Sequence, residues 1–366
     1  MAVPLLDLKR QYAPIRADID RAIGTVIDHG QFILGPEVAR LEAEIAAFCV
    51  VKHAVGVASG TDALLLALQA CGVGPGDEVI TSAFSFFSSA GVISRLGARP
   101  VFVDIDPDTF NIDPNRIEKA VTRRTRAIMP IHLFGQCADM DPIMKIADKR
   151  GIKVVEDAAQ AIGSGYRERS AGTIGAAGCF SFFPTKNLGC AGDGGMIITN
   201  DDDIAGTTKM LRVHGGRSEY VHEVVGYNSR LDTIQAAILS AKLPYLPGWT
   251  EARRKNAARY DRALAGLPLR TPVVREWAYH IYNQYTIALD RRDELKAWLQ
   301  KKQIGHKVYY PVPFHMQQCF SDLGYSPGDL PNCERAAETV ISIPIFGEMT
   351  SAEQDEVIAA IREFFV

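Results

Sequence analysis

Two short apolar runs of the sequence each lead to a polar residue that could do chemistry. Val154 and Val155 precede Asp157, and the run Phe180–Phe183 leads through a proline and a threonine to Lys186. Ligands of open parallel α/β sheets bind at the carboxyl ends of the strands, where these two side chains would meet. A lysine removed from bulk water holds its proton less strongly and becomes a nucleophile toward carbonyl groups. With an aspartate that suits a cationic ring nitrogen, the pair indicates a site for pyridoxal phosphate (PLP).

A phosphate site is expected at the strand-to-helix junction that begins at Ser59. Gly60 would let the backbone approach a ligand closely, and the free N–H groups around Thr61 would lie at the positive end of a helix dipole. A simple helix cap explains the same residues, and the neighbouring cofactor lysine favours the phosphate. Ser181 could add a hydroxyl donor to the phosphate or could bond the backbone of its own strand.

Three further side chains could contact a cofactor or a substrate. Gln160, three residues after Asp157, could bond a phenolate-type oxygen or lie on a helix surface. Phe86 follows an expected strand at 80–82 and could stack on a planar ring or pack in the core. Arg230 opens an apolar helix and could clamp an anionic substrate group, or it could pair with Asp232.

The elements that would position these residues alternate between strand and helix. The expected strands are 53–59, 78–82, 100–105, 127–132, 152–157, 179–183 and 195–199, with helices such as 61–71 and 141–150 between them. This alternation predicts an α/β domain with a mostly parallel central sheet. The last two strands are separated only by a Gly-rich link, which allows one antiparallel pair.

The length of the chain and a change in composition predict two domains. The 366 residues exceed what one simple core accommodates. The composition changes at 244–248, so we place the boundary near Trp249, with a large domain at 1–248 and a smaller α+β domain at 249–366. In the smaller domain, strands are expected at 284–289 and 307–310, and helices at 251–264, 292–302 and 351–365.

The composition is that of a soluble globular protein. The net charge of -3 and the 23% of charged residues predict no binding to nucleic acid or to a membrane surface. Seven scattered cysteines without a CxxC pair indicate reduced thiols and no metal site. Because neither a signal peptide nor a membrane span is visible, we expect a cytoplasmic protein. The apolar segment 30–36 is a candidate contact with a partner subunit.

Six motifs together resemble the DegT–StrS sugar-nucleotide aminotransferases, which are PLP enzymes of fold type I. In chain order they are Asp7–Tyr12, Gly60–Leu64, Gly74–Ile80, Glu156–Gln160, Ser181–Gly189 and Asn228–Asp232. Each motif is weak alone, but their order and spacing cover nearly the whole chain. The resemblance implies an aspartate aminotransferase-like large domain and a homodimer with shared active sites.

The resemblance also implies a role for each site residue. Lys186 would form the Schiff base with PLP and carry the proton, Asp157 would hold the pyridinium nitrogen, and Gln160 would lie near the ring hydroxyl. The residues expected to bind the rest of the cofactor are Gly60, Thr61 and Ser181 at its phosphate, Phe86 and Ala159 on the two ring faces, and Asn228 at the phosphate of the partner's cofactor. The residues expected at the sugar nucleotide are Arg230, Tyr309, Tyr310 and His315.

The implied reaction moves an amino group, with glutamate as expected donor, to a keto-sugar on a nucleotide. The amino sugar would enter a polysaccharide, lipid or glycoside pathway. The form Gly192-Asp193-Gly194-Gly195 is similar to that of members that act at carbon 3, whereas many members that act at carbon 4 have Glu-Gly-Gly. The alternatives are a carbon 4 aminotransferase and a non-catalytic regulator that binds a sugar nucleotide. A nicotinamide-dependent dehydrogenase is disfavoured because a well-placed GxGxxG is missing.

Overall fold

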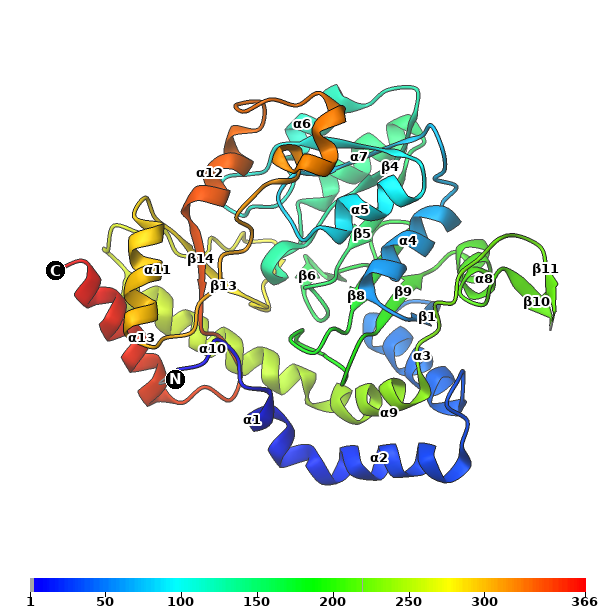
Figure 1. Cartoon of the computed structure of the whole chain (residues 1–366), viewed down its shortest axis with the longest axis horizontal. Coiled ribbons are helices and arrows are strands. Elements are labelled where there is room, and N and C mark those ends of the chain that lie inside the picture. The colour runs from blue at the N-terminus through cyan, green and yellow to red at the C-terminus, as the bar shows by residue number, and fades with distance from the viewer. Residues whose placement is uncertain (1–2, 219) are drawn as a thin grey trace.

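A seven-stranded sheet forms the centre of the protein (Figure 1), whose computed structural model describes residues 3–218 and 220–366. The strand order is β1-β9-β8-β5-β4-β2-β3. The strands are β1 (His53–Val57), β2 (Glu78–Ser82), β3 (Arg99–Val103), β4 (Thr125–Met129), β5 (Lys153–Asp157), β8 (Ala177–Ser181) and β9 (Gly195–Thr199). Pairings from β3 through β8 are parallel, and only β9 runs antiparallel to its neighbours β8 and β1. The predicted mostly parallel sheet is therefore confirmed.

Helices cover both faces of the sheet. Neighbouring residues of a strand therefore pack into two different hydrophobic cores, one on each face. Val154 packs into one core and Val155 into the other, and Ile198 and Ile197 divide in the same way. The helices α4 (Gly60–Ala70), α5 (Ser88–Arg95) and α8 (Asp202–Leu211) cover one face. The other face packs against α3 (Pro36–Cys49), α6 (Pro114–Ala120), α7 (Met140–Arg150) and α9 (Thr233–Lys242), with α2 (Arg16–His29) outside α9. This arrangement is the three-layer form that parallel sheets require.

Strand β8 begins and ends earlier than the strand that the sequence predicts at 179–183. β8 starts at Ala177, which pairs with Val155, and it ends at Ser181 rather than at Phe183. Phe182 has already left the sheet, and the N–H of Cys190 donates to its carbonyl oxygen at 2.8 Å. The shift matters because it makes Phe182–Cys190 a closed loop that carries Lys186.

The C-terminal part has its own core around a two-stranded antiparallel sheet. Its elements are α10 (Leu246–Leu264), β13 (Tyr285–Ala288), α11 (Arg292–Lys301), α12 (Pro331–Thr339), β14 (Val340–Ile343) and α13 (Ser351–Phe364). The N-terminal Val3 also packs into this core. The expected strand at 307–310 is wrong, because only Lys307 pairs there, through an isolated bridge to Ser342. We propose that the two domains divide within α10, whose first turns contain Trp249.

The remaining elements are short. They are α1 (Leu8–Tyr12), a sheet of β12 (Ala278–Tyr279), β6 (Gly165–Tyr166) and β7 (Arg169–Ser170), the hairpin of β10 (Gly216–Ser218) and β11 (Val221–His222), and 3₁₀ helices at Ala13–Ile15, Leu133–Gly135, Leu243–Tyr245, Phe314–Met316 and Gln318–Leu323. The β10–β11 hairpin projects from the body of the molecule (Figure 1). Within the described ranges, no helix is long and apolar enough to cross a membrane.

Candidate active site

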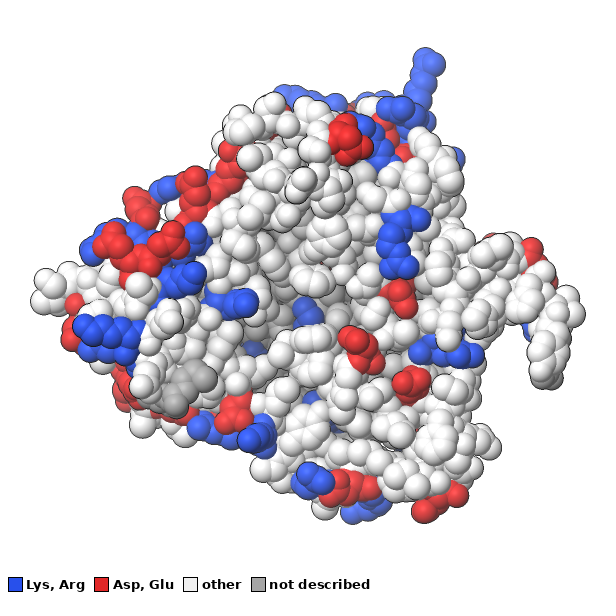
Figure 2. All heavy atoms as spheres, in the orientation of Figure 1, with Lys and Arg blue, Asp and Glu red and all other residues white. Residues whose placement is uncertain are grey.

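A cavity of about 360 Å³ lies at the carboxyl ends of the central strands. The face of the molecule in Figure 2 is hollowed at its middle, with a few basic atoms visible at depth. The volume is in the range of small-molecule sites. The residues expected at the site that line this cavity are Gly60, Thr61, Phe86, Asp157, Ala159, Gln160, Ser181, Lys186, Tyr309 and Tyr310. All but three of the predicted site residues are therefore brought together.

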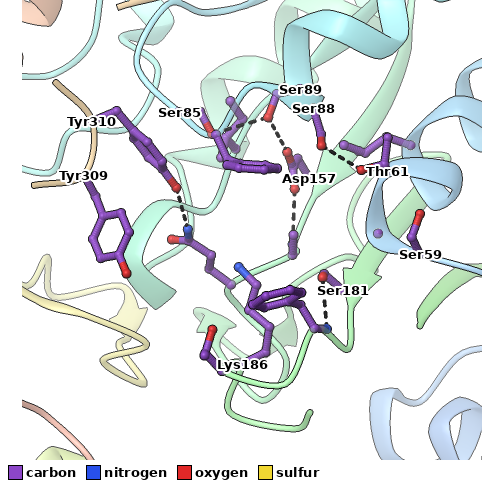
Figure 3. Close-up of a pocket in the computed structure, with 18 of the residues that line it drawn as sticks. Ser59, Thr61, Ser85, Ser88, Ser89, Asp157, Ser181, Lys186, Tyr309 and Tyr310 are labelled. Atoms are coloured by element: carbon purple, nitrogen blue, oxygen red, sulfur yellow. Dashed lines mark hydrogen bonds between the residues drawn. The ribbon is translucent and has the colours of Figure 1, made fainter. Parts of the chain in front are cut away.

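Lys186 enters the cavity from the tight loop after β8 (Figure 3). The loop is compact because the Lys186 N–H donates to the carbonyl oxygen of Phe183 at 2.9 Å. Gly189 is required there, since a Cβ at this position would lie 2.4 Å from the carbonyl oxygen of Pro184. Burial lowers the pKa of Lys186 to about 8, and the charge of Asp157 only partly opposes this shift. A substantial fraction of this amine is therefore neutral near pH 8, as a nucleophile or a base requires.

Asp157 ends β5 and faces the same cavity, with 4% of its surface exposed. Its carboxylate accepts a hydrogen bond from the Ser89 hydroxyl at 2.7 Å and from the Ala159 N–H at 3.2 Å. Burial raises the pKa of Asp157 above its ordinary value, whereas these two donors and the charge of Lys186 act in the opposite direction. A cationic N–H at this place would relieve the cost of burying the carboxylate.

A buried pair behind Asp157 fixes the end of β5. Glu156 is fully buried, and its carboxylate accepts from the backbone N–H groups of Gly172, Ile174 and Gly175 at 2.6–2.8 Å. His132 Nδ1 accepts from a backbone N–H, so its Nε2 carries the proton that it donates to Glu156 at 2.8 Å. The backbone N–H of His132 donates to the backbone carbonyl oxygen of Asp157 at 2.9 Å. The carboxylate of Asp157 thus stands on a rigid support.

The opposite end of the cavity is formed by the start of α4. Ser59 caps this helix by accepting from the Asp62 N–H at 3.1 Å. In the described part of the chain, the N–H groups of Gly60 and Thr61 have no hydrogen-bond acceptor. Only glycine fits at position 60, because a Cβ would lie 2.5 Å from that of Ser181. The close approach leaves free N–H groups beside a hydroxyl, an arrangement that suits a phosphate.

Gln160 is held inside the cavity rather than on a helix surface. Its Oε1 accepts from the Phe134 N–H at 2.7 Å, and its Nε2 donates to the Tyr310 hydroxyl at 3.1 Å (Figure 3). Phe86 and Ala159 line the same space, and Phe86 remains 59% exposed. An exposed aromatic ring at a cavity is available to stack on a planar ligand.

Three expected site residues do not line the cavity within a single chain. Asn228 is exposed and accepts from the Arg230 guanidinium at 2.6 Å, and Arg230 lies in a separate hollow beside the β10–β11 hairpin. The expected alternative, Arg230 paired with Asp232, is not seen among the described residues, where Arg230 bonds Asn228 and the Asp232 side chain makes no capping hydrogen bond. His315 is buried, and its Nε2 lies 3.0 Å from Glu334 Oε1.

Sequence reasoning missed the residues that support this site. Ser89 bonds Asp157 directly but belongs to a run of serines without a distinguishing pattern. Asn187, beside Lys186, accepts from the side-chain amide of Asn283 at 2.8 Å. Because Asn187 and Asn283 are 96 residues apart, the sequence gives no sign of this contact. Glu156 offered a usable signal, because an acid inside an apolar strand needs several hydrogen-bond donors.

The residues of the cavity fit PLP. Free N–H groups and a hydroxyl meet at the α4 end, where Gly60 leaves room that any other side chain would fill. A buried carboxylate with a raised pKa lies at the sheet, and a desolvated amine enters from the facing loop. These groups match the phosphate, the ring nitrogen and the aldehyde of this cofactor. Among the residues that the structure describes, no group of three or more His, Cys, Asp or Glu has the placement of a metal site.

Comparison with known sequences gives matches over nearly the whole chain. The profile of the DegT/DnrJ/EryC1/StrS aminotransferase family matches residues 14–362. A "Pleiotropic regulatory protein" of Geobacillus stearothermophilus is 53% identical, with 100% of this chain and 99% of the relative covered. A UDP-N-acetyl-3-dehydro-alpha-D-glucosamine 3-aminotransferase of Acidithiobacillus ferrooxidans is 44% identical, with 99% and 97% covered. A dTDP-3-amino-3,4,6-trideoxy-alpha-D-glucose transaminase of Streptomyces venezuelae is 45% identical, with 99% and 96% covered.

Solved structures agree with these matches. The crystal structure of DesV from S. venezuelae has a TM-score of 0.97 at 45% identity, and 99% of this chain and 98% of that chain are covered. The structure of NtdA from Bacillus subtilis, with the bound cofactor PMP, has a TM-score of 0.93 at 32% identity, with 99% and 85% covered. The expected aminotransferase fold is therefore confirmed along the whole chain.

Proposed function

The chain belongs to the DegT/DnrJ/EryC1/StrS aminotransferase family and is a PLP-dependent enzyme, and we propose that it transfers an amino group from glutamate to carbon 3 of a nucleotide-linked keto-sugar. The desolvated Lys186 and the buried Asp157 in one cavity carry this proposal. Carbon 3 is supported by the names of two relatives, at 44% and 45% identity, which are a 3-aminotransferase and a transaminase of a 3-amino sugar. It is also consistent with the Gly192–Gly195 motif.

PLP supplies, when bound, an aldehyde that bonds amines and a ring that takes up electrons from the carbon beside them. The N–H groups of Gly60 and Thr61 and the Ser181 hydroxyl would hold its phosphate. Asp157 would hold the ring nitrogen, and Gln160 would lie at the ring hydroxyl. Phe86 and Ala159 would cover the two faces of the ring. These groups reach the cavity from the start of α4, the segment before α5, the end of β5 with the loop that follows it, and the end of β8.

Lys186 would move the proton in both half-reactions. With a pKa of about 8, its amine takes a proton from the α-carbon of glutamate and later gives one to carbon 3 of the sugar. The same group serves both directions because its two protonation states differ little in free energy near that pH. Asp157, supported by Ser89 and the Ala159 N–H, would remain ionised while a cationic N–H faces it.

The substrate-facing rim would be completed by a second copy of this chain. Asn228 and Arg230 lie outside the cavity of their own subunit, near Tyr220 of the β10–β11 hairpin, which is 88% exposed, and near Val225 after the hairpin, which is 91% exposed. Exposed apolar side chains that lie close together are typical of an interface. In the homodimer Asn228 would reach the partner's cofactor phosphate and Arg230 an anionic group of the sugar nucleotide, opposite Tyr309 and Tyr310 of the cavity wall. All seven cysteines are free thiols, six of them buried, which suits a reducing, cytoplasmic location.

A non-catalytic regulator is the second candidate, because the relative at 53% identity is named a regulatory protein. Binding alone does not require an amine with a lowered pKa, which costs folding free energy below pH 8. The retention of Lys186 opposite Asp157 therefore favours the enzyme.

Spectroscopy followed by product analysis tests the proposal. The purified protein with PLP should have a visible absorption band that glutamate removes and 2-oxoglutarate restores. A UDP-linked or dTDP-linked 3-keto-sugar should also restore it, and nuclear magnetic resonance of the product should place nitrogen on carbon 3. Lys186→Ala serves as the control without the amine. A band that glutamate leaves unchanged would favour the regulator, and nitrogen on carbon 4 would overturn the regiochemistry.

A further inference from the structure

A second lysine is buried next to the reactive loop but does not line the cavity. Lys242 ends α9 and is 0% exposed. Its Nζ donates to the carbonyl oxygen of Gly189 at 2.5 Å and, more weakly, to the Tyr12 hydroxyl at 3.4 Å. Gly189 is the third residue after Lys186 in the same loop. A buried cation is thus bonded to the backbone that presents the reactive amine.

Aromatic rings hold the ammonium of Lys242 from the other sides. The ring centre of Tyr12 lies 4.4 Å from Nζ, and that of Trp249 lies 5.9 Å away. Such contacts stabilise a desolvated cation. Cys190 and Glu348 also favour the charged form, whereas burial lowers the pKa of Lys242 to about 8. The ammonium is therefore held by the Gly189 carbonyl, the Tyr12 hydroxyl and two rings, with Glu348 as a nearby carboxylate.

The Lys242 contact also explains a motif that the proposed reaction does not use. Tyr12 ends the N-terminal motif Asp7–Tyr12, which forms α1. Arg10 in this motif donates to Glu353 of α13 at 2.7 Å, so α1 is fixed to the C-terminal helix. Tyr12 is therefore held in place from outside the reactive loop and can act as a fixed wall for Lys242.

The two limbs of the loop are packed so that neither moves alone. A Cβ at Gly189 would lie 2.4 Å from the carbonyl oxygen of Pro184 and 2.8 Å from that of Phe183, so the two limbs lie close together here. The Cys190 N–H donates to the carbonyl oxygen of Phe182 at 2.8 Å and closes the loop. A displacement of Gly189 would therefore also displace the segment between Pro184 and Gly189, which contains Lys186. Since a shift of about 1 Å at a reacting group is costly, an anchor on Gly189 has functional value.

We infer that Lys242 is a positioning residue for Lys186: its ammonium, held against the Tyr12 ring, anchors the Gly189 carbonyl and so fixes the loop that keeps the Lys186 amine desolvated in the cavity. This inference rests on the proposed role of Lys186. A purely structural lysine would lower stability when replaced but would leave the proton affinity of Lys186 unchanged. The two roles therefore differ in a measurable quantity.

Competitive labelling of the cofactor-free protein makes this measurement. Traces of acetic anhydride react with neutral amines, and mass spectrometry of the peptide that contains Lys186 gives the labelling midpoint against pH. The variants are Lys242→Met, which keeps the volume but loses the charge, and Tyr12→Leu, which removes the ring. Arg292→Met is the matched control, because Arg292 is also a buried cation that donates to two carbonyl groups, those of Ala337 and Val340, at 3.0 Å.

In Lys242→Met, the midpoint of Lys186 should rise by about one pH unit or more toward the ordinary lysine value, because a looser loop admits water. Tyr12→Leu should raise the midpoint less, and it decides the question if Lys242→Met does not fold. Arg292→Met should lower the unfolding temperature and leave the midpoint in place. An unchanged midpoint in the folded Lys242 and Tyr12 variants would overturn the inference. Labelling needs neither cofactor nor substrate, so this outcome is distinct from a failure of the glutamate experiment.

Discussion

The inner wall of the cavity and the rim beside the β10–β11 hairpin differ in how completely one chain builds them. At the inner wall, Asp157 is 4% exposed, Glu156 is fully buried, and their carboxylate oxygens have donors from the same chain. At the rim, Val225 is 91% and Tyr220 88% exposed. In Figure 2 the projecting hairpin is mostly uncharged. The inner wall is thus complete within one chain, whereas the rim exposes apolar side chains near Asn228 and Arg230, which the proposed homodimer would cover with a second copy.

This difference separates two kinds of experimental effect. Changes at the inner wall should alter chemistry and leave the oligomeric state unchanged, because Asp157 and Glu156 are buried within one chain. Changes at the apolar side chains of the rim, such as Val225, should alter self-association first and activity only through it. The following predictions test this separation, beginning with the largest effect.

Replacing Lys186 by alanine should remove transamination, with a loss of about a thousandfold or more, since the amine acts in both half-reactions. The protein should remain folded and be no less stable at neutral pH, because a lysine whose pKa is lowered to about 8 destabilises the folded state below that pH. Turnover and thermal unfolding at pH 7 measure both effects. A variant that retains a tenth of the activity would contradict the role of Lys186.

Asp157→Asn should fold and remain dimeric but lose activity about a hundredfold or more, because a neutral amide does not hold a ring proton by charge. The amide is nearly the same size and can still accept from Ser89, so a stability loss is not expected to account for the effect. Initial rates and sedimentation measure the two properties. Near-normal turnover would remove the charge of Asp157 from the account.

Val225→Asp should raise the dissociation constant of the dimer by about tenfold or more, because a charged side chain replaces an exposed apolar one in the proposed interface. Activity should fall with dilution and recover at high protein concentration. Concentration-dependent sedimentation and rate measurements provide the readout, with Lys209→Asp on the nearby helix α8 as a surface control. A dimer that is unaffected would place the interface elsewhere.

Ser89→Ala should give the smallest effect, a several-fold loss that depends on pH. The Ser89 hydroxyl lowers the pKa of Asp157, so its removal raises that pKa further. The ionised form of Asp157 then disappears at a higher pH as the solution is acidified, and the acidic limb of the rate profile should move upward. Ser85→Ala, which removes a neighbouring hydroxyl that bonds Ser89 and not Asp157, is the control. A limb that does not move would show that Ser89 does not tune Asp157.

The sequence was most informative where local pattern determines structure. The apolar runs before Asp157 and Lys186, and the glycine that precedes Thr61, predict the cavity because each sits at a strand end or a helix start. The strand at 307–310 was predicted from local composition alone, and tertiary contacts reduced it to one bridge at Lys307.

The supporting residues were not predictable because their partners are distant in the chain. Ser89 and Asp157 are 68 residues apart, Asn187 and Asn283 are 96 apart, and Lys242 and Gly189 are 53 apart. No local periodicity encodes such a contact, since it depends on how the elements pack. The same holds for His315 and Glu334, which lie 19 residues apart and whose contact no local pattern predicts.

The most direct test of the account is to find which amine bonds the cofactor. Desolvation lowers the pKa values of two lysines, Lys186 and Lys242, to about 8, but of these two only Lys186 lines the cavity. Borohydride reduction of the protein with PLP, followed by peptide mapping, should recover the pyridoxyl group on Lys186 and leave Lys242 unmodified. Recovery of the group on Lys242, or on any other lysine, would contradict the site described above.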